Sequence, residues 1–167
     1  MRKTLSLTAV AALLASTPPL NAQEHESATE VQSAEEASAE RAYHNRQQAY
    51  LSSLMTSDGW YAMEGGLRWR YVEYKGVGAK PTPADKVTVH YEGSFIDGTV
   101  FDSSFGGKPA EFPLRGLIEA WEMAIPQMHV GETIEIAAPA SLAYGPRGRG
   151  PIPGGATLLF KVELLGK

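Results

Sequence analysis

The stretch VTVHYEGSFIDGTVFDSS, residues Val87–Ser104, decides the fold. Its first half alternates apolar and polar side chains, the pattern of a half-buried strand, and one face carries Val87, Val89, Tyr91 and Phe95. Asp97-Gly98 then interrupts the alternation, and this dipeptide between two extended runs is a strong signal for a tight hairpin. The stretch therefore predicts two antiparallel strands that are joined at Asp97-Gly98.

Three further runs outside this hairpin alternate in the same way: Leu67–Tyr71, Ile134–Ile136 and Leu158–Leu165. One segment between the hairpin and the run that begins at Ile134 has apolar residues at helical spacing, namely Ile118, Trp121 and Ile125. One short helix among about five strands predicts an α+β domain, in which a twisted antiparallel sheet packs on the helix.

The composition sets outer limits on function. The chain has 167 residues, enough for one domain and an extension. Hydrophobic residues make up 43% and charged residues 20%, which excludes a wholly disordered chain. No cysteine is present, so disulfides, cysteine-ligated metals and thiol catalysis are excluded. The net charge of −4 argues against a nucleic-acid partner, which would need a clustered basic surface.

Residues 1–22 have the pattern of a secretory signal sequence. Arg2 and Lys3 precede an apolar run from Leu5 to Ala15, and a break with two prolines leads to Ala22. A membrane span needs about 20 apolar residues, so this run is too short to be an anchor. We expect cleavage after Ala22 and export to the periplasm. The alternative is a buried N-terminal helix.

Residues 23–57 form an acidic extension with six Glu and neither Gly nor Pro. Its second part, Ala39–Met55, places four apolar side chains on one helical face: Tyr43, Tyr50, Leu51 and Leu54. We expect a short helix there, ended by Ser57-Asp58-Gly59. Three roles stay open: a solvated helix that covers part of the next domain, an arm for self-association or client contact, and disorder. Repulsion among the Glu side chains favours a monomer or a weak homodimer.

Six blocks of the remaining chain occur in a recognisable order and spacing: VHYEG (89–93), DGTVFDSS (97–104), LIEAW (117–121), QMHVGE (127–132), LAYG (142–145) and ATLLFKVELL (156–165). This ordered set resembles the FKBP-type peptidyl-prolyl cis–trans isomerases. In addition, Arg46–Leu67 is similar to the helix and linker before the domain in the periplasmic macrophage-infectivity-potentiator type. The resemblance implies an isomerase domain at residues 58–167, built as an antiparallel half-barrel of five to six strands around one short helix.

The resemblance also implies where the site lies, in a pocket between helix and sheet. The catalytic residues that it implies are Tyr91, Phe101, Asp102 and Tyr144. The substrate-binding residues are Phe112, Leu117, Ile118, Trp121, Ile152 and Phe160. In this view Trp121 is the floor under the proline ring, the Tyr144 hydroxyl and the Ile118 N–H hold substrate carbonyls, Ile152 belongs to a flap, and Asp102 is framework rather than a general base.

The implied reaction is rotation about X–Pro bonds of exported proteins, which assists their folding. It breaks no covalent bond, so we expect no nucleophile, metal or cofactor. The implied partners are unfolded or partly folded proline-containing proteins and macrolide inhibitors. The alternative function is a non-catalytic chaperone that binds peptides with the same apolar pocket.

Other chemistries fit the sequence poorly. A carboxylate pair for glycoside hydrolysis could be sought among Asp97, Asp102, Glu92 and Glu111, but Asp97 belongs to the turn and Glu92 faces away from Tyr91. The four His show no metal-ligand spacing. The chain also departs from the family pattern, since Glu119-Ala120 precedes the Trp and two cations, Arg147 and Arg149, enter the flap. Either these arginines only keep a mobile loop soluble, or they attract substrates with acidic residues near the proline.

Overall fold

The structure is a computed structural model that describes residues 20–167, with side chains from residue 29 onward. The chain divides into two compact units between Ala39 and Glu40. The expected signal sequence lies outside the described residues up to residue 19. None of the helices within residues 20–167 is both long and apolar enough to cross a membrane.

The first helix, α1 (Leu20–Ser53), is 34 residues long and begins well before the segment in which the sequence predicted a helix. Residues 20–53 contain neither Gly nor Pro and are rich in Ala, Glu and Gln, which have high helix propensity. The side chains from Thr29 to Ala39 are almost all exposed, so this part of α1 lacks the apolar stripe on which the prediction depended. Gly59, in the left-handed region at φ 82°, follows a 3-10 turn (Thr56–Asp58) rather than ending α1.

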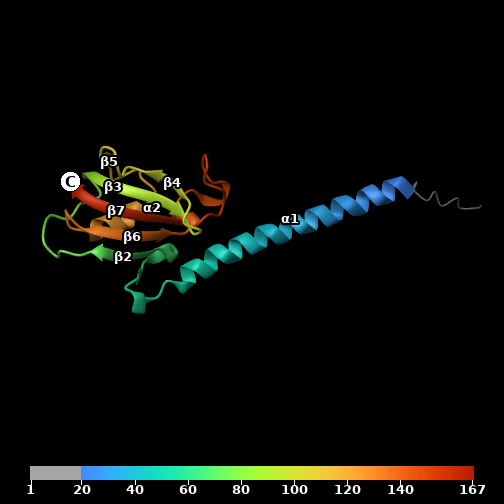
Figure 1. The fold of residues 1–167 in the computed structure, drawn as a ribbon, viewed down its shortest axis with the longest axis horizontal. Coiled ribbons are helices and arrows are strands. Elements are labelled where there is room, and N and C mark those ends of the chain that lie inside the picture. Colours follow the sequence, from blue (N-terminus) through green and yellow to red (C-terminus); the bar gives the residue numbers. More distant parts are fainter. Residues whose placement is uncertain (1–19) are drawn as a thin grey trace, which may run out of the picture. The chain divides into compact units, whose positions relative to one another are not determined.

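One antiparallel sheet of seven strands makes up most of the second unit (Figure 1). Its strands are β1 (Tyr61–Ala62), β2 (Arg68–Glu73), β3 (Lys86–Phe95), β4 (Val100–Ser103), β5 (Ala110–Pro113), β6 (Thr133–Ala138) and β7 (Leu158–Gly166). They follow the order β1-β2-β6-β7-β3-β4, and β5 pairs with β3 beside β4. The predicted antiparallel sheet is confirmed. The strands β1 and β5 were not foreseen individually, because two to four residues are too few to show an alternation.

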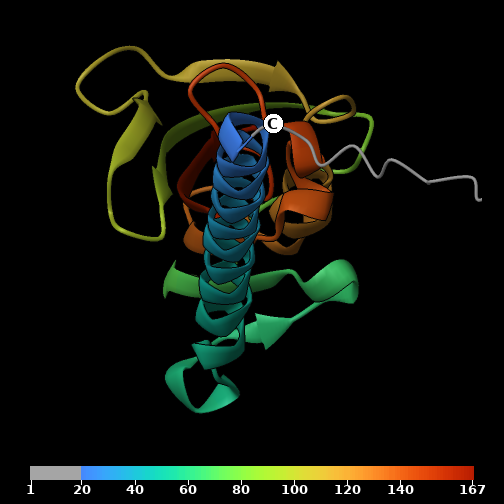
Figure 2. The same ribbon diagram turned by 90° about the vertical axis from the view of Figure 1, so that its right-hand side faces the viewer.

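A short helix, α2 (Glu119–Ala124), packs on the sheet and confirms the predicted α+β architecture. The end-on view of Figure 2 shows the strands curving rather than lying flat. Further 3-10 turns lie at Glu64–Gly66, Ile125–Gln127, Ala140–Leu142 and Gly145–Arg147. Pro126 sits in the first positions of the turn that follows α2, which is why the regular helix ends at Ala124.

Two details of the predicted strands are confirmed. In β7 the alternation is complete, with Leu158, Phe160, Val162 and Leu164 all buried. At the hairpin, the N–H of Gly98 donates to the Phe95 carbonyl at 2.9 Å, and Gly98 has a φ of 86°. A residue with a side chain is strained in that conformation, so Gly98 fixes the turn and with it the register of β3 and β4.

The C-terminal part of α1 belongs to the same compact unit as the sheet. Leu51 is buried in a small cluster with Trp60 and Ala137, the latter on β6. The buried amide of Gln47 accepts a hydrogen bond from the N–H of Thr157 at 2.9 Å. Of the three roles left open for the extension, these contacts match a helix that covers part of the domain, for residues 40–53.

This docking predicts a cost for removing the end of α1. The free energy of unfolding should be about 1.5–3 kcal/mol lower for a chain that starts at Asp58 than for one that starts at Glu40, because the burial of Leu51 alone contributes about that much. Chemical denaturation of the two chains compares them directly. Equal midpoints and slopes would mean that the helix end contributes nothing to the stability of the domain.

Candidate active site

One pocket of about 290 Å³ brings together nine of the ten residues that the sequence led us to expect at a site. We call it the aromatic pocket, because six of its lining side chains are aromatic. The nine are Tyr91, Phe101, Asp102, Phe112, Leu117, Ile118, Trp121, Tyr144 and Phe160. They come from β3, β4, β5, α2, β7, the loop before α2 and, for Tyr144, the segment after β6, so only the folded chain assembles them.

Trp121 forms the base of the aromatic pocket and is 4% exposed. Its ring meets three others edge-on: Tyr91 at 5.4 Å, Phe112 at 6.2 Å and Phe160 at 5.4 Å between centroids. Edge-to-face pairs of this kind are worth about 0.5–1.5 kcal/mol each beyond the area they bury. The indole Nε1 is the one buried side-chain polar atom of the described residues that has no hydrogen-bond partner. The floor is therefore a buried ring packed against three others, with one free donor.

Tyr91 and Asp102 form the polar edge of the aromatic pocket. The Tyr91 hydroxyl donates to Oδ2 of Asp102 at 2.6 Å, a short bond of the charge-assisted kind. Burial, followed by this hydrogen bond and the charge of Asp102, raises the pKa of Tyr91 to about 12. Tyr91 therefore stays protonated at neutral pH and holds Asp102 in place, which fits a framework role for that carboxylate.

The loop before α2 is fixed by the helix itself. Glu122 accepts a hydrogen bond from the N–H of Gly116 at 2.7 Å, and the carbonyl of Ile118 accepts from Trp121 and Glu122 in the first turn of α2. This places Leu117 and Ile118 on the pocket wall. Within residues 20–167, the N–H of Ile118 and the hydroxyl of Tyr144 make no hydrogen bond, so both remain available to a ligand.

Gly93 makes room for the wall formed by Phe101. A Cβ added at Gly93 would lie 2.6 Å from the Phe101 ring and 3.1 Å from the Phe160 ring. Phe101 and Phe160 in turn pack edge-on, with centroids 6.0 Å apart. The absence of a side chain at Gly93, near the end of β3, thus lets two aromatic rings close one side of the aromatic pocket.

The structure does not bring Ile152 to the pocket lining. Its side chain is buried in the hydrophobic core, and its backbone forms a two-way bridge with Arg149. Arg149 lines the aromatic pocket instead, with its guanidinium 6.0 Å from the centre of the Tyr144 ring. The sequence places Arg149 in the flap but does not mark it as a site residue. Arg147 lines none of the cavities described here.

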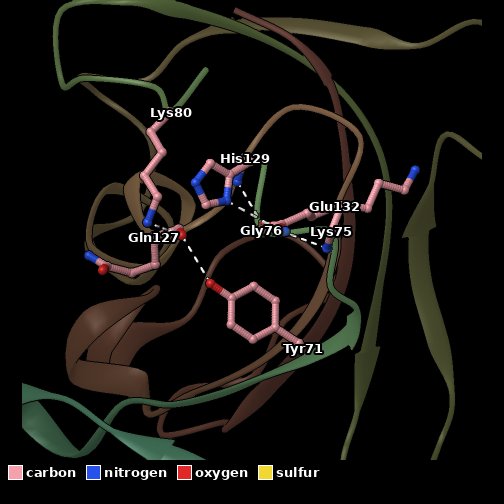
Figure 3. A network of polar contacts seen from close by, with 7 residues as sticks. All are labelled: Tyr71, Lys75, Gly76, Lys80, Gln127, His129 and Glu132. Atoms are coloured by element: carbon pink, nitrogen blue, oxygen red, sulfur yellow. Dashed lines mark hydrogen bonds and ion pairs between the residues drawn. The ribbon is translucent and has the colours of Figure 1, made fainter. Parts of the chain in front are cut away.

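A polar network outside the pocket includes Gln127, in the 3-10 turn that follows α2, and Glu132 (Figure 3). Tyr71 and Lys80 both donate to the carbonyl of Gln127, at 3.1 and 2.9 Å. Nearby, the fully buried Glu132 accepts from the backbone N–H groups of Lys75, Gly76 and His129 at 2.8–2.9 Å. Burial alone would raise the pKa of Glu132, but these hydrogen bonds outweigh it and the pKa is lowered.

Larger cavities exist, but they lack this lining. One of about 530 Å³ lies between the end of α1 and the loop before β7, and Tyr43 and Phe95 are its only aromatic residues. The aromatic pocket has six. The dense aromatic lining, the free donors at its edge and the fixed framework make it the candidate active site.

Comparison with known proteins agrees with this geometry. Residues 78–165 match the profile of the family described as FKBP-type peptidyl-prolyl cis-trans isomerase. The chain belongs to this FKBP family. The matched segment contains all nine residues of the aromatic pocket and Arg149.

Individual FKBP relatives are similar over a longer stretch. The chain is 48% identical over 118 residues to the FKBP-type 22 kDa peptidyl-prolyl cis-trans isomerase of Escherichia coli K12, which covers 70% of this chain and 57% of that protein. It is 44% identical over 119 residues to the outer membrane protein MIP of Legionella longbeachae, covering 70% and 51%. The chain thus spans about half the length of the curated relatives that it matches.

Solved structures show the same FKBP fold. The crystal structure of FkpA from Escherichia coli superposes with a TM-score of 0.69 at 33% identity, covering 86% of this chain and 71% of that chain. A peptidyl-prolyl cis-trans isomerase from Pseudomonas syringae pv. tomato gives 0.69 at 28% identity, covering 75% and 93%. The resemblance that the sequence motifs carried, and the antiparallel FKBP architecture, are therefore confirmed.

Proposed function

We propose that the chain catalyses cis–trans isomerisation of X–Pro peptide bonds in exported proteins and so assists their folding. The observation that carries this proposal is the aromatic pocket, with Trp121 as its floor and two unpaired donors, Tyr144 and Ile118, at its edge. A pyrrolidine ring is a compact apolar group that always accompanies an X–Pro bond, and an aromatic pocket of about 290 Å³ has room for it.

The pocket suits the physical demands of this reaction. Rotation must break amide resonance, against a barrier of about 18–20 kcal/mol. The planar amide is charge-separated and favoured by water, whereas the twisted amide has a localised nitrogen lone pair. An apolar site that excludes water therefore disfavours the planar state relative to the twisted one. Donors that meet the carbonyls only in the twisted geometry add binding energy that is specific to the transition state.

Each site residue has a role in this proposal. Trp121 supports the proline ring, and Phe101, Phe112 and Phe160 are the walls that exclude water. The Tyr144 hydroxyl and the Ile118 N–H bind substrate carbonyls. Asp102 orients Tyr91 through their 2.6 Å hydrogen bond and transfers no proton. No step requires a metal or a cofactor.

Replacing Tyr144 with Phe tests the carbonyl donor. We expect kcat/KM for proline peptides to fall about two- to thirteenfold, because one hydrogen bond contributes about 1 ± 0.5 kcal/mol. Tyr74→Phe is the matched control, since Tyr74 is 64% exposed and lies away from the aromatic pocket. Equal activity of the two variants would show that the Tyr144 hydroxyl does not contact the substrate.

The decisive experiment is a prolyl-peptide isomerisation assay on the full chain, with and without a macrolide inhibitor. The proposal requires a rate above the uncatalysed one and its loss when the macrolide occupies the pocket. If the rate equals the uncatalysed one while aggregation of unfolded clients is still suppressed, the chain is the peptide-binding chaperone that we named as the alternative.

The organisation and location are also proposed here. We infer a signal sequence at residues 1–22, an acidic extension at residues 23–57 and the isomerase domain at residues 58–167, with the mature chain in the periplasm as a monomer or weak homodimer. The basic-then-apolar start of the sequence supports export, and one relative is named as an outer membrane protein. The proposed clients are unfolded or partly folded proteins that contain proline.

A further inference from the structure

A second cavity of about 410 Å³ adjoins the aromatic pocket, and we call it the adjoining cavity. The two cavities share four lining residues: Leu117, Ile118, Tyr144 and Arg149. Because they have a common wall, an extended peptide with its proline in the aromatic pocket can place its neighbouring residues in the adjoining cavity. The residues of the shared wall therefore lie next to the proline of such a peptide.

Arg149 is the only cationic side chain that lines either cavity. The anionic ones are Asp102 in the aromatic pocket and Glu119 in the adjoining cavity. Asp102 is engaged by the Tyr91 hydroxyl. Among the described residues, no carboxylate lies within ion-pair distance of Arg149, so its charge is free to meet a ligand.

The backbone holds Arg149 in this position. Its N–H donates to the carbonyl of Ile152 at 2.9 Å, and its carbonyl accepts from the N–H of Ile152 at 3.0 Å. Ile152 is itself buried in the core, so the bridge ties an exposed loop to a fixed point. The guanidinium then lies over the Tyr144 ring, a contact that arginine makes favourably. The free charge is thus held at the shared wall instead of moving with a loose loop.

We propose that Arg149 is a specificity-determining residue, which selects substrates with an acidic residue directly before or directly after the proline. This proposal rests on the proposed isomerase function, whose substrate class it narrows. An exposed ion pair at the edge of a site acts on binding more than on the chemical step, and salt screens it. The selection should therefore lower KM for acidic peptides and leave kcat nearly unchanged.

The same loop provides a matched control. Arg147 carries the same charge two residues earlier but lines neither cavity. Arg147→Gln and Arg149→Gln change the net charge of the protein equally, so the general attraction of acidic peptides changes equally in both. Any difference between the two variants in their preference for acidic peptides is therefore due to the position of Arg149 at the shared wall.

The test measures kcat and KM for tetrapeptides that carry Glu, Gln or Lys directly before the proline, and a second set with these residues directly after it. For the wild type we expect kcat/KM to favour Glu over Gln about two- to fivefold in at least one set at low salt, the range that exposed ion pairs give. Arg149→Gln should bring this ratio to about one by raising KM for the Glu peptide. Arg149→Lys should keep part of the preference for Glu, and Arg147→Gln should leave the ratio unchanged. The ratio should approach unity at about 1 M salt, where the Debye length is about 3 Å.

Three results would overturn the inference: no preference for Glu in either set, a preference for Lys, or an equal loss in Arg147→Gln and Arg149→Gln. A parallel measurement of peptide affinity by fluorescence anisotropy tests the role of Arg149 separately from the proposed isomerase function. If no peptide is isomerised, the proposed function fails, and the affinities of the Glu and Gln peptides still decide whether Arg149 selects acidic ligands.

Discussion

Trp121→Leu is expected to lower kcat/KM for proline peptides by about tenfold or more, which corresponds to about 1.4 kcal/mol of lost transition-state binding. The indole is the floor of the aromatic pocket and meets three other rings edge-on, so a leucine removes both the surface under the proline and the packing that keeps the walls in place. Leucine remains apolar and fits the space, so the fold should survive. Trp121→Ala would lose about 3–5 kcal/mol of stability and confuse the two effects.

Trp69→Leu is the matched control for this variant. Trp69 is also a buried tryptophan with aromatic neighbours, Tyr61 and Tyr71, but it lies on β2 outside the aromatic pocket. We expect Trp69→Leu to be less stable than the wild type and to keep its kcat/KM. Stopped-flow assays on both variants, at a temperature where circular dichroism shows both folded, give the comparison. Unchanged catalysis in Trp121→Leu would mean that the proline ring binds elsewhere.

Periodicity predicted the strands that cross the core. The Leu158–Leu164 alternation and the Asp97-Gly98 turn needed only the period of a strand and the steric freedom of glycine, and both are local properties. The N-terminal half of α1 could not be found in this way. Its described side chains, those from Thr29 onward, are exposed, so no burial pattern marks this part of the helix, and only helix propensity favours it.

The site residues were a different problem. By spacing alone, Tyr91, Phe101 and Phe112 look like ordinary core residues, and only the order of the family motifs marked them as a pocket. Their convergence depends on which strands become neighbours, which is a property of the whole chain. Arg149 was placed near the pocket but not in its wall, because a loop of Gly and Pro has no period and the bridge to Ile152 is visible only in the fold.

Glu132 shows most clearly what a sequence conceals. A glutamate directly after the Val130-Gly131 turn is expected to be solvated, because charged side chains are almost never fully buried unless they are paired. The structure buries it completely. Its partners are the backbone N–H groups of Lys75 and Gly76, some 56 residues earlier in the chain, together with the N–H and the ring Nδ1 of His129. Backbone donors carry no sequence signal, so the contacts with Lys75 and Gly76 could not have been predicted.

We expect Glu132→Gln to destabilise the protein by about 2–4 kcal/mol, since hydrogen bonds to a charged acceptor contribute about 1.5–3 kcal/mol each. One carboxylate oxygen accepts from Lys75 and Gly76, and the other accepts from the N–H of His129. An amide can keep only one of these two acceptors. The NH₂ group that replaces the other oxygen faces a backbone donor in a fully buried place. Chemical denaturation near neutral pH measures the loss.

Glu135→Gln is the matched control, because Glu135 lies only three residues further along the chain, on β6, and pairs with Arg70 at 2.7 Å on a partly exposed face. An ion pair of this kind is worth about 0.2–1 kcal/mol, so its loss should be small. Equal losses in Glu132→Gln and Glu135→Gln would show that the buried hydrogen bonds add nothing beyond a surface charge.

The pH dependence gives an independent check on Glu132. Its pKa in the folded state is lowered, so the folded state binds fewer protons than the unfolded state in the acidic range. The stabilisation is therefore fully present above the ordinary glutamate pKa of about 4.3 and is lost as the pH falls through the lower folded-state value. The difference in the free energy of unfolding between the wild type and Glu132→Gln should stay constant from neutral pH down to about 4.3, the ordinary glutamate pKa, and then shrink as the pH falls towards the folded-state value. A difference that grows on acidification would require a raised pKa, and would mean that the three backbone hydrogen bonds do not outweigh burial.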